Sequence, residues 1–164
     1  MATSSGRPHV GDCENLRFQL QLELMRRAFG DARFRLRVGL SNETVPAFHA
    51  QHPHVKCDVV FIDGDKYPGP RLTDVHNMRA MAHAGSLVFF DEATTLECVS
   101  GAVPEAKCGN AWDGAPKAFN RASREGTVRV RECSRNPKPL RGRWNDFGGL
   151  KDNVCEAVYL DAPS

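Results

Sequence analysis

Charged residues gather at two points of the chain, each directly after an apolar run: VVFI from residue 59 and SLVFF from residue 86. The charged residues at these points are Asp63, Asp65, Lys66, Asp91 and Glu92. Carboxylate oxygens from two strand ends suit Mg²⁺, Ca²⁺ or Mn²⁺ as ligands. A lysine that has released its proton beside them can act as a general base. These residue types therefore offer cation binding combined with removal of a proton.

The same pattern has a plainer interpretation. Polar residues follow many strands simply because the chain turns at the surface, where backbone and side chains meet water. Spacing alone leaves the functional and the plain interpretation open.

The two apolar runs are predicted to be neighbouring parallel strands. Between them, residues 71–84 have the apolar spacing of a helix, which ends at Gly85. A strand, helix and strand with uninterrupted apolar strands predict a βαβ unit whose strands are covered on both faces. Because ligands bind at the carboxyl ends of such strands, we expect Asp63 and Asp91 to project into one crevice.

Further elements are predicted on both sides of this unit. We expect a disordered N-terminus over residues 1–13 and one α/β domain over residues 14–162. Within that domain, helices are predicted over residues 14–29, 44–49 and 111–125, the second capped by Ser41. Alternating residues predict strands over 33–38, 127–133 and 154–160, and the last two form an antiparallel hairpin around the loop 135–149.

Composition excludes several classes of protein. The 164 residues are 41% hydrophobic and 26% charged with a net charge of +2, which favours a soluble globular protein without nucleic-acid or membrane partners. No run approaches the roughly 18 apolar residues of a membrane span, and the first residues lack the apolar region of a secretion signal. We therefore expect a cytoplasmic location. The six cysteines are irregularly spaced, so we expect neither a zinc site nor disulfides.

The chain resembles a known family over residues 16–133. Three segments, VGLSNETVP (38–46), CDVVFIDGDKY (57–67) and GSLVFFDE (85–92), are similar to the C-terminal two-thirds of class I S-adenosylmethionine-dependent methyltransferases. The similarity is to small-molecule O-methyltransferases of the catechol and caffeoyl-CoA type and to relatives with an IDGxHxY signature. It implies a Rossmann-like, mostly parallel sheet that ends in an antiparallel hairpin and lacks the family's first two strands.

The resemblance also implies roles for individual residues. S-adenosylmethionine would be the cofactor, and the residues that would contact it are Ser41, Asn42, Asp63 and Asp65. In metal-dependent members a divalent cation such as Mg²⁺ binds the acids that match Asp63, Asp91 and Glu92, the last of which replaces the family's usual Asn. Lys66 would take the proton from the hydroxyl group of a small-molecule acceptor.

A different class of function is also open. The family's glycine-rich cofactor loop has no counterpart before Glu14. The predicted strand over residues 33–38 must then pair directly with VVFI, find a partner in another chain, or leave a sheet edge open. The alternative to O-methyl transfer is therefore a non-catalytic remnant of the fold that self-associates through an exposed sheet edge.

Overall fold

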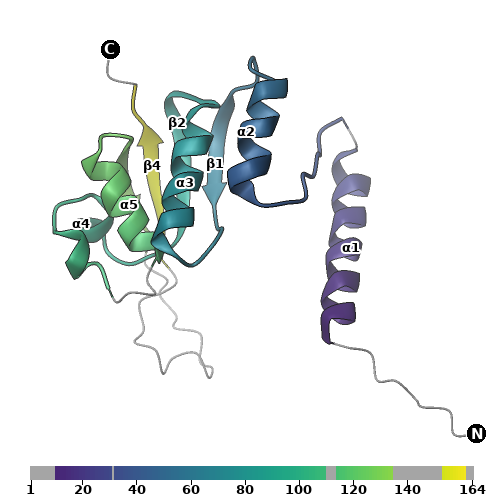
Figure 1. Ribbon diagram of the computed structural model, residues 1–164, viewed down its shortest axis with the longest axis horizontal. Helices are drawn as coiled ribbons and strands as arrows, with labels where there is room; N and C mark the ends of the chain where they lie inside the picture. Colours follow the sequence, from purple (N-terminus) through teal and green to yellow (C-terminus); the bar gives the residue numbers. More distant parts are fainter. Residues whose placement is uncertain (1–9, 31, 110–113, 135–152, 162–164) are drawn as a thin grey trace, which may run out of the picture. The chain divides into compact units, whose positions relative to one another are not determined.

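The computed structural model describes residues 10–30, 32–109, 114–134 and 153–161. The chain divides into two units, Met1–Val38 and Gly39–Ser164. The first contains the helix α1 (Val10–Phe29), and the second contains all four strands (Figure 1). The predicted loop 135–149 lies outside the described residues.

The first unit confirms one predicted helix and overturns a predicted strand. Helix α1 begins at Val10, earlier than predicted, and ends before Gly30, whose φ of 71° is a conformation that glycine adopts without strain. The backbone amides of Arg33 and Phe34 both donate to the carbonyl oxygen of Gly30 at 3.1 Å. These turn bonds replace ladder bonds, and residues 33–38 belong to no strand. The predicted strand is therefore wrong, and pairing with VVFI, one of the three arrangements that the sequence left open for it, does not occur.

The second unit is built on a four-stranded sheet in the order β1-β2-β4-β3. The strand β1 (Cys57–Ile62) pairs in parallel with β2 (Ala82–Ala93). The strand β4 (Asn153–Tyr159) lies antiparallel between β2 and β3 (Val128–Cys133). The α/β class, the βαβ unit and the closing hairpin are thus confirmed. Among the described strands, β1, β2 and β3 run in the same direction and β4 runs against them, in agreement with a mostly parallel sheet that ends in an antiparallel hairpin. The absence of the family's first two strands remains a prediction.

Three longer helices accompany the sheet: α2 (Ser41–Gln51), α3 (Pro68–Arg79) and α5 (Gly114–Arg124). Two short ones, α4 (Leu96–Val99) and the 3₁₀ helix η1 (Glu105–Lys107), lie between β2 and α5. Helix α3 starts with Pro68 at a position that needs no amide hydrogen. Ser41 is the first helical residue of α2 and does not cap it, because Leu40 precedes the helix. Within the described residues, no helix is long and apolar enough to cross a membrane.

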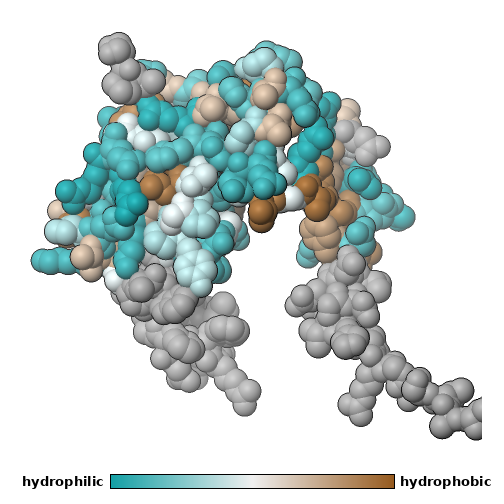
Figure 2. Space-filling view, in the orientation of Figure 1, coloured by the Kyte–Doolittle hydropathy of each residue, from teal (hydrophilic) through white to brown (hydrophobic). Residues whose placement is uncertain are grey.

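The core lies between the sheet and the helices α3 and α5, which cover one of its faces (Figure 1). Its centre is the stacked pair Phe90 and Phe119, whose rings lie 3.5 Å apart between centroids. The helix-covered side of this unit presents mostly hydrophilic residues to solvent (Figure 2). On the other face, Val59 and Phe61 of β1 remain 57% and 60% exposed. The prediction that β1 is covered on both faces is therefore wrong for the described chain.

Two disulfides join cysteines that are distant in sequence. Cys98 pairs with Cys108 across the α4–η1 segment, with Cα atoms 5.4 Å apart. Cys133 of β3 pairs with Cys155, which lies directly opposite on β4. The expectation of six unpaired thiols is wrong because wide spacing in sequence does not predict which cysteines the fold brings together.

Candidate functional site

The site lies where β1 and β2 end. The two strands run in parallel and their last pair is Ile62 with Phe90, so the residues after that pair, Asp63 in the loop and Asp91 in the last part of β2, lie next to one another. This placement follows from the apolar runs themselves, because the runs VVFI and SLVFF end at paired residues, and the first polar residue after each run therefore lies at the same edge of the sheet.

The carboxyl groups of Asp63 and Asp91 interact directly. Partial burial raises the pKa of Asp63 most, followed by the negative charge of Asp91 and a hydrogen bond between the two carboxyl groups. The positive charges of Lys66 and Arg71 lower the same pKa. The structure therefore brings the two predicted acids together, and the pKa of Asp63 lies above its ordinary value.

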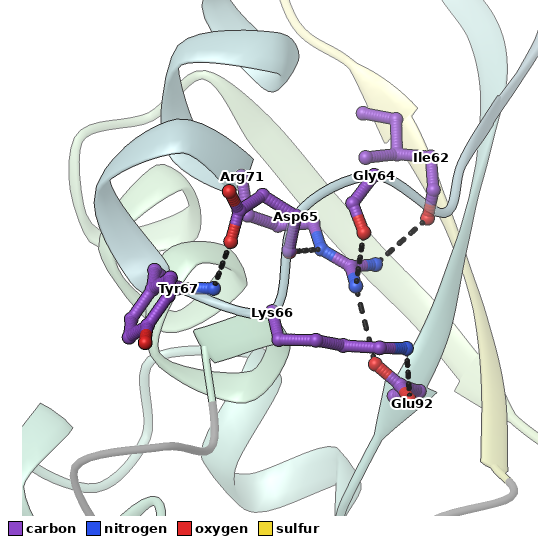
Figure 3. Close-up of polar contacts among 7 residues, drawn as sticks. All are labelled: Ile62, Gly64, Asp65, Lys66, Tyr67, Arg71 and Glu92. Atoms are coloured by element: carbon purple, nitrogen blue, oxygen red, sulfur yellow. Dashed lines mark hydrogen bonds and ion pairs between the residues drawn. The ribbon is translucent and has the colours of Figure 1, made fainter. Parts of the chain in front are cut away.

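The third predicted acid, Glu92, points to a different set of partners (Figure 3). Its Oε1 accepts from Nζ of Lys66 at 2.5 Å, and its Oε2 accepts from Nη2 of Arg71 at 3.2 Å. Both carboxylate oxygens are thus engaged by cationic side chains from the loop after β1 and the start of α3.

The backbone at Glu92 explains this direction. Its φ of 59° lies in the left-handed region, which non-glycine residues rarely adopt. The pairing of β2 with β4 is irregular between Phe90 and Ala93, so the strand bulges at the site. Bulges change the direction of side chains next to the irregularity. Here the bulged segment carries the acid that reaches Lys66 and Arg71.

Arg71 organises the loop between β1 and α3, and its side chain has no exposed surface. Its guanidinium group donates to the carbonyl oxygens of Asp65 at 2.8 Å, Ile62 at 3.2 Å and Gly64 at 3.3 Å, in addition to Glu92 (Figure 3). A planar group with five donors is suited to binding several acceptors at once. Arg71 therefore holds the backbone that carries Asp63.

Asp65 stabilises the same loop through a hydrogen bond of its side chain. Its Oδ1 accepts from the backbone amide of Tyr67 at 2.8 Å, a turn that aspartate commonly stabilises. Asp65 is an exposed residue, and Asp63 is also exposed over much of its surface, although its carboxyl group is partly shielded from water. The roles in cofactor binding predicted for both remain predictions.

Ser41 and Asn42 open helix α2 and are exposed. Figure 1 shows that α2 begins at the same end of the sheet at which β1 ends. The two residues therefore lie at the correct end of the sheet for a ligand that also contacts Asp63. Gly39, just before them, has a φ of 142°, and a Cβ there would lie 2.8 Å from a methyl group of Thr44.

Two functional positions were not predicted. The sequence places Arg71 at the start of a predicted helix and Gly114 within another, with no further role for either. A Cβ at Gly114 would overlap the carbonyl oxygen of Lys66, so α5 packs directly against the backbone of the loop. The one available signal for Arg71 was a lone arginine in the first turn after an acidic loop.

The predicted cation site is not assembled from all three acids. Within the described residues, no group of three or more His, Cys, Asp or Glu side chains is arranged to hold a metal ion. Asp63 and Asp91 lie together, but Glu92 is engaged by Lys66 and Arg71.

An open pocket of about 310 Å³ occurs in the first unit. Its lining consists of Arg26, Phe34, Arg35, Leu36 and Arg37. None of these residues was assigned a role from the sequence.

Comparison with known families gives one match. A family model described as a methyltransferase domain matches residues 4–93, which is more than half of the chain and includes β1, α3 and β2. No curated protein matches the chain.

Proposed function

We propose, because the chain belongs to the methyltransferase domain family, that it transfers a methyl group from S-adenosylmethionine to a hydroxyl group of a small molecule. The observation that carries this proposal is the meeting of Asp63, Asp91 and Lys66 at the ends of two parallel strands. Ligand sites of open α/β sheets lie at that edge.

The chemistry of the acids supports a cationic cofactor. Asp63 and Asp91 place two carboxyl groups in contact, and their mutual repulsion is one reason why the pKa of Asp63 is raised. S-adenosylmethionine, when bound, supplies a methyl group on a positively charged sulfur, and a positive charge near the pair relieves that repulsion. We assign Asp63 to the cofactor, with Ser41 and Asn42 as hydrogen-bonding residues at the start of α2.

Lys66 is the residue we assign to the proton of the acceptor. Its Nζ lies at the open side of the loop and has Glu92 as its partner at 2.5 Å. While Nζ carries its proton in this ion pair, it has no lone pair to accept another. Lys66 therefore acts as a base only after its proton has left, and Glu92 is the adjacent group that orients Nζ.

Calorimetry with S-adenosylhomocysteine tests the proposal. The protein is expected to bind it in the micromolar range, and Asp63→Ala is expected to weaken binding by at least about tenfold, or 1.4 kcal/mol. Asp161→Ala is the matched control, because Asp161 follows β4 at the opposite end of the sheet. Absence of binding at millimolar ligand would refute the cofactor assignment.

A second function is favoured by a separate observation. In the described part of the sheet β1 is an edge strand, and its outward residues Val59 and Phe61 are exposed. Edge strands pair readily with other edges. We propose as the alternative a non-catalytic domain that self-associates through β1 of a second copy, and its test is given in the Discussion.

A further inference from the structure

Five charged side chains meet at the strand ends, and their pairing divides them into two groups. The carboxyl groups of Asp63 and Asp91 interact with each other. The carboxylate of Glu92 interacts with Lys66 and Arg71 (Figure 3). Three negative and two positive charges therefore share one small region of the sheet edge.

The second group is built into the fold. Arg71 is fully buried, and of its four acceptors only Glu92 carries a charge. A buried guanidinium group requires a charged partner, because an unpaired charge in the interior is costly. The left-handed backbone at Glu92 directs the carboxylate to this partner and away from the regular line of β2.

We propose that Glu92 is the shared partner of two cationic side chains of the protein itself, Lys66 and Arg71, and not a ligand for a divalent cation. We also propose that Arg71 is a positioning residue for the loop between β1 and α3. Lys66 and Arg71 supply at Glu92 the positive charge that a metal would otherwise supply. The pairing of Glu92 does not depend on the proposed function. Only its consequence does: if the chain transfers a methyl group, it does so without Glu92 as a metal ligand.

The proposal makes Lys66 a competitor of any added cation. A divalent ion that approaches the loop is repelled by Nζ of Lys66 and finds both oxygens of Glu92 occupied. Removing the ammonium group frees Oε1 and leaves the acids with one fewer positive neighbour.

Titration with Mn²⁺, followed by electron paramagnetic resonance of the free ion, tests this directly. We expect Glu92→Gln to leave the Mn²⁺ affinity of the full chain within about twofold of the wild type. We expect Lys66→Met to raise that affinity by at least about tenfold. Lys107→Met is the matched control, because Lys107 is exposed in η1, and it should change nothing. A tenfold loss in Glu92→Gln, or no gain in Lys66→Met, would overturn the proposal.

A second measurement isolates the positioning role of Arg71. Arg71→Lys keeps the charge but cannot reach all four acceptors, so the ¹⁵N order parameters of Gly64 and Asp65 are expected to fall from about 0.85 to below about 0.6. Arg79→Lys is a close control, because Arg79 is on the same helix and donates to the carbonyl oxygens of Leu160 and Asp161 at 3.1 and 2.8 Å.

The outcomes separate positioning from general stability. The positioning role would be refuted if the order parameter of Val88 in the core fell equally in Arg71→Lys, or if the order parameters of Gly64 and Asp65 did not change. Neither measurement uses the cofactor. Failure to bind S-adenosylhomocysteine would therefore refute the proposed function and leave this inference to be decided by Mn²⁺ and the order parameters.

Discussion

Arg71 and Glu92 join the start of α3 to the end of β2, with Nη2 lying 3.2 Å from Oε2 and the guanidinium group fully buried. Because removal of Glu92 leaves a buried cation without its charged partner, Glu92→Ala is expected to lower the free energy of unfolding by about 2–3 kcal/mol. Urea unfolding measures the change. Glu132→Ala on β3, which removes an exposed carboxylate, should cost less than about 0.5 kcal/mol. Equal effects of the two changes would contradict the importance of this pair.

Gly114 and Gly69 provide a matched pair of substitutions near the loop. A Cβ at Gly114 would overlap the carbonyl oxygen of Lys66, whereas a Cβ at Gly69 would meet no atom within 4 Å. Gly114→Ala is therefore expected to destabilise the protein by about 1–3 kcal/mol through displacement of the loop or of α5. Gly69→Ala is expected to cost less than Gly114→Ala, because its only steric conflict is with the ring of the following Pro70, which disfavours a helical conformation in the residue before it. Thermal unfolding of both variants checks the contrast, and a stable Gly114→Ala protein would show that α5 does not constrain Lys66.

Local patterns predicted most elements of the second unit. The apolar runs of β1 and β2 and the helix between them dictate a parallel pair, and this pair alone placed Asp63 beside Asp91. The alternating residues of β3 and β4 likewise predicted the hairpin. The predicted strand over residues 33–38 failed because its formation depends on contacts with residues outside that segment. Residues 33–38 alternate like a strand, but turn bonds to Gly30 replace the ladder that a strand needs.

The candidate site was predictable in its residue types but not in its pairing. Sequence spacing could not reveal that a bulge in β2 directs Glu92 to Arg71, because the bulge depends on the register with β4. It also could not reveal that Arg71 binds three carbonyl oxygens, since those bonds depend on the path of the loop after β1. The disulfides were missed for the same reason, as Cys133 and Cys155 meet only through the pairing of β3 and β4.

Stability should depend on pH through Asp63. Partial burial and the neighbouring Asp91 raise the pKa of Asp63 in the folded protein above its unfolded value. The folded state therefore binds the proton more tightly, and this contribution to stability is complete below the unfolded pKa and is lost as the pH rises through the folded pKa. Asp63→Asn should accordingly melt at a higher temperature than the wild type at pH 7, and the difference should vanish near pH 3.

Melting curves of the wild type and Asp63→Asn between pH 3 and 8 measure this difference. Asp161→Asn is the control, because it removes a carboxylate at the other end of the sheet. A pH-independent difference for Asp63→Asn would show that the pKa of Asp63 is not raised in the folded protein.

The disulfide Cys133–Cys155 should contribute measurably to stability. It closes a loop with a sequence separation of 22, for which restriction of the unfolded chain corresponds to about 3 kcal/mol. Replacing both cysteines with serine should lower the free energy of unfolding by about that amount. Cys57→Ser is the control, since Cys57 is a free thiol whose pKa is raised mainly by burial. The double variant keeps the disulfide Cys98–Cys108, so dithiothreitol is expected to act on both proteins. If it lowers the melting temperature of the wild type by more than that of the double variant, the bond Cys133–Cys155 forms. Disulfides persist in oxidising compartments, so their formation would weigh against the cytoplasmic location, which remains a prediction.

Phe61 tests self-association through β1. Its side chain is 60% exposed beside Val59 on an edge strand of the described sheet, so pairing of two copies at this edge would bury apolar surface. If the proposed association occurs, the wild type will sediment as a dimer, and Phe61→Lys will shift it to monomer by burying an unpaired charge at the contact. Leu96→Lys is the matched control, because Leu96 is 42% exposed in α4 and does not belong to the sheet. A wild type that stays monomeric at concentrations up to about 100 μM, where a contact worth 5.5 kcal/mol would be detected, would refute the alternative function. If Leu96→Lys dissociates the dimer and Phe61→Lys does not, the two copies do not contact each other through β1.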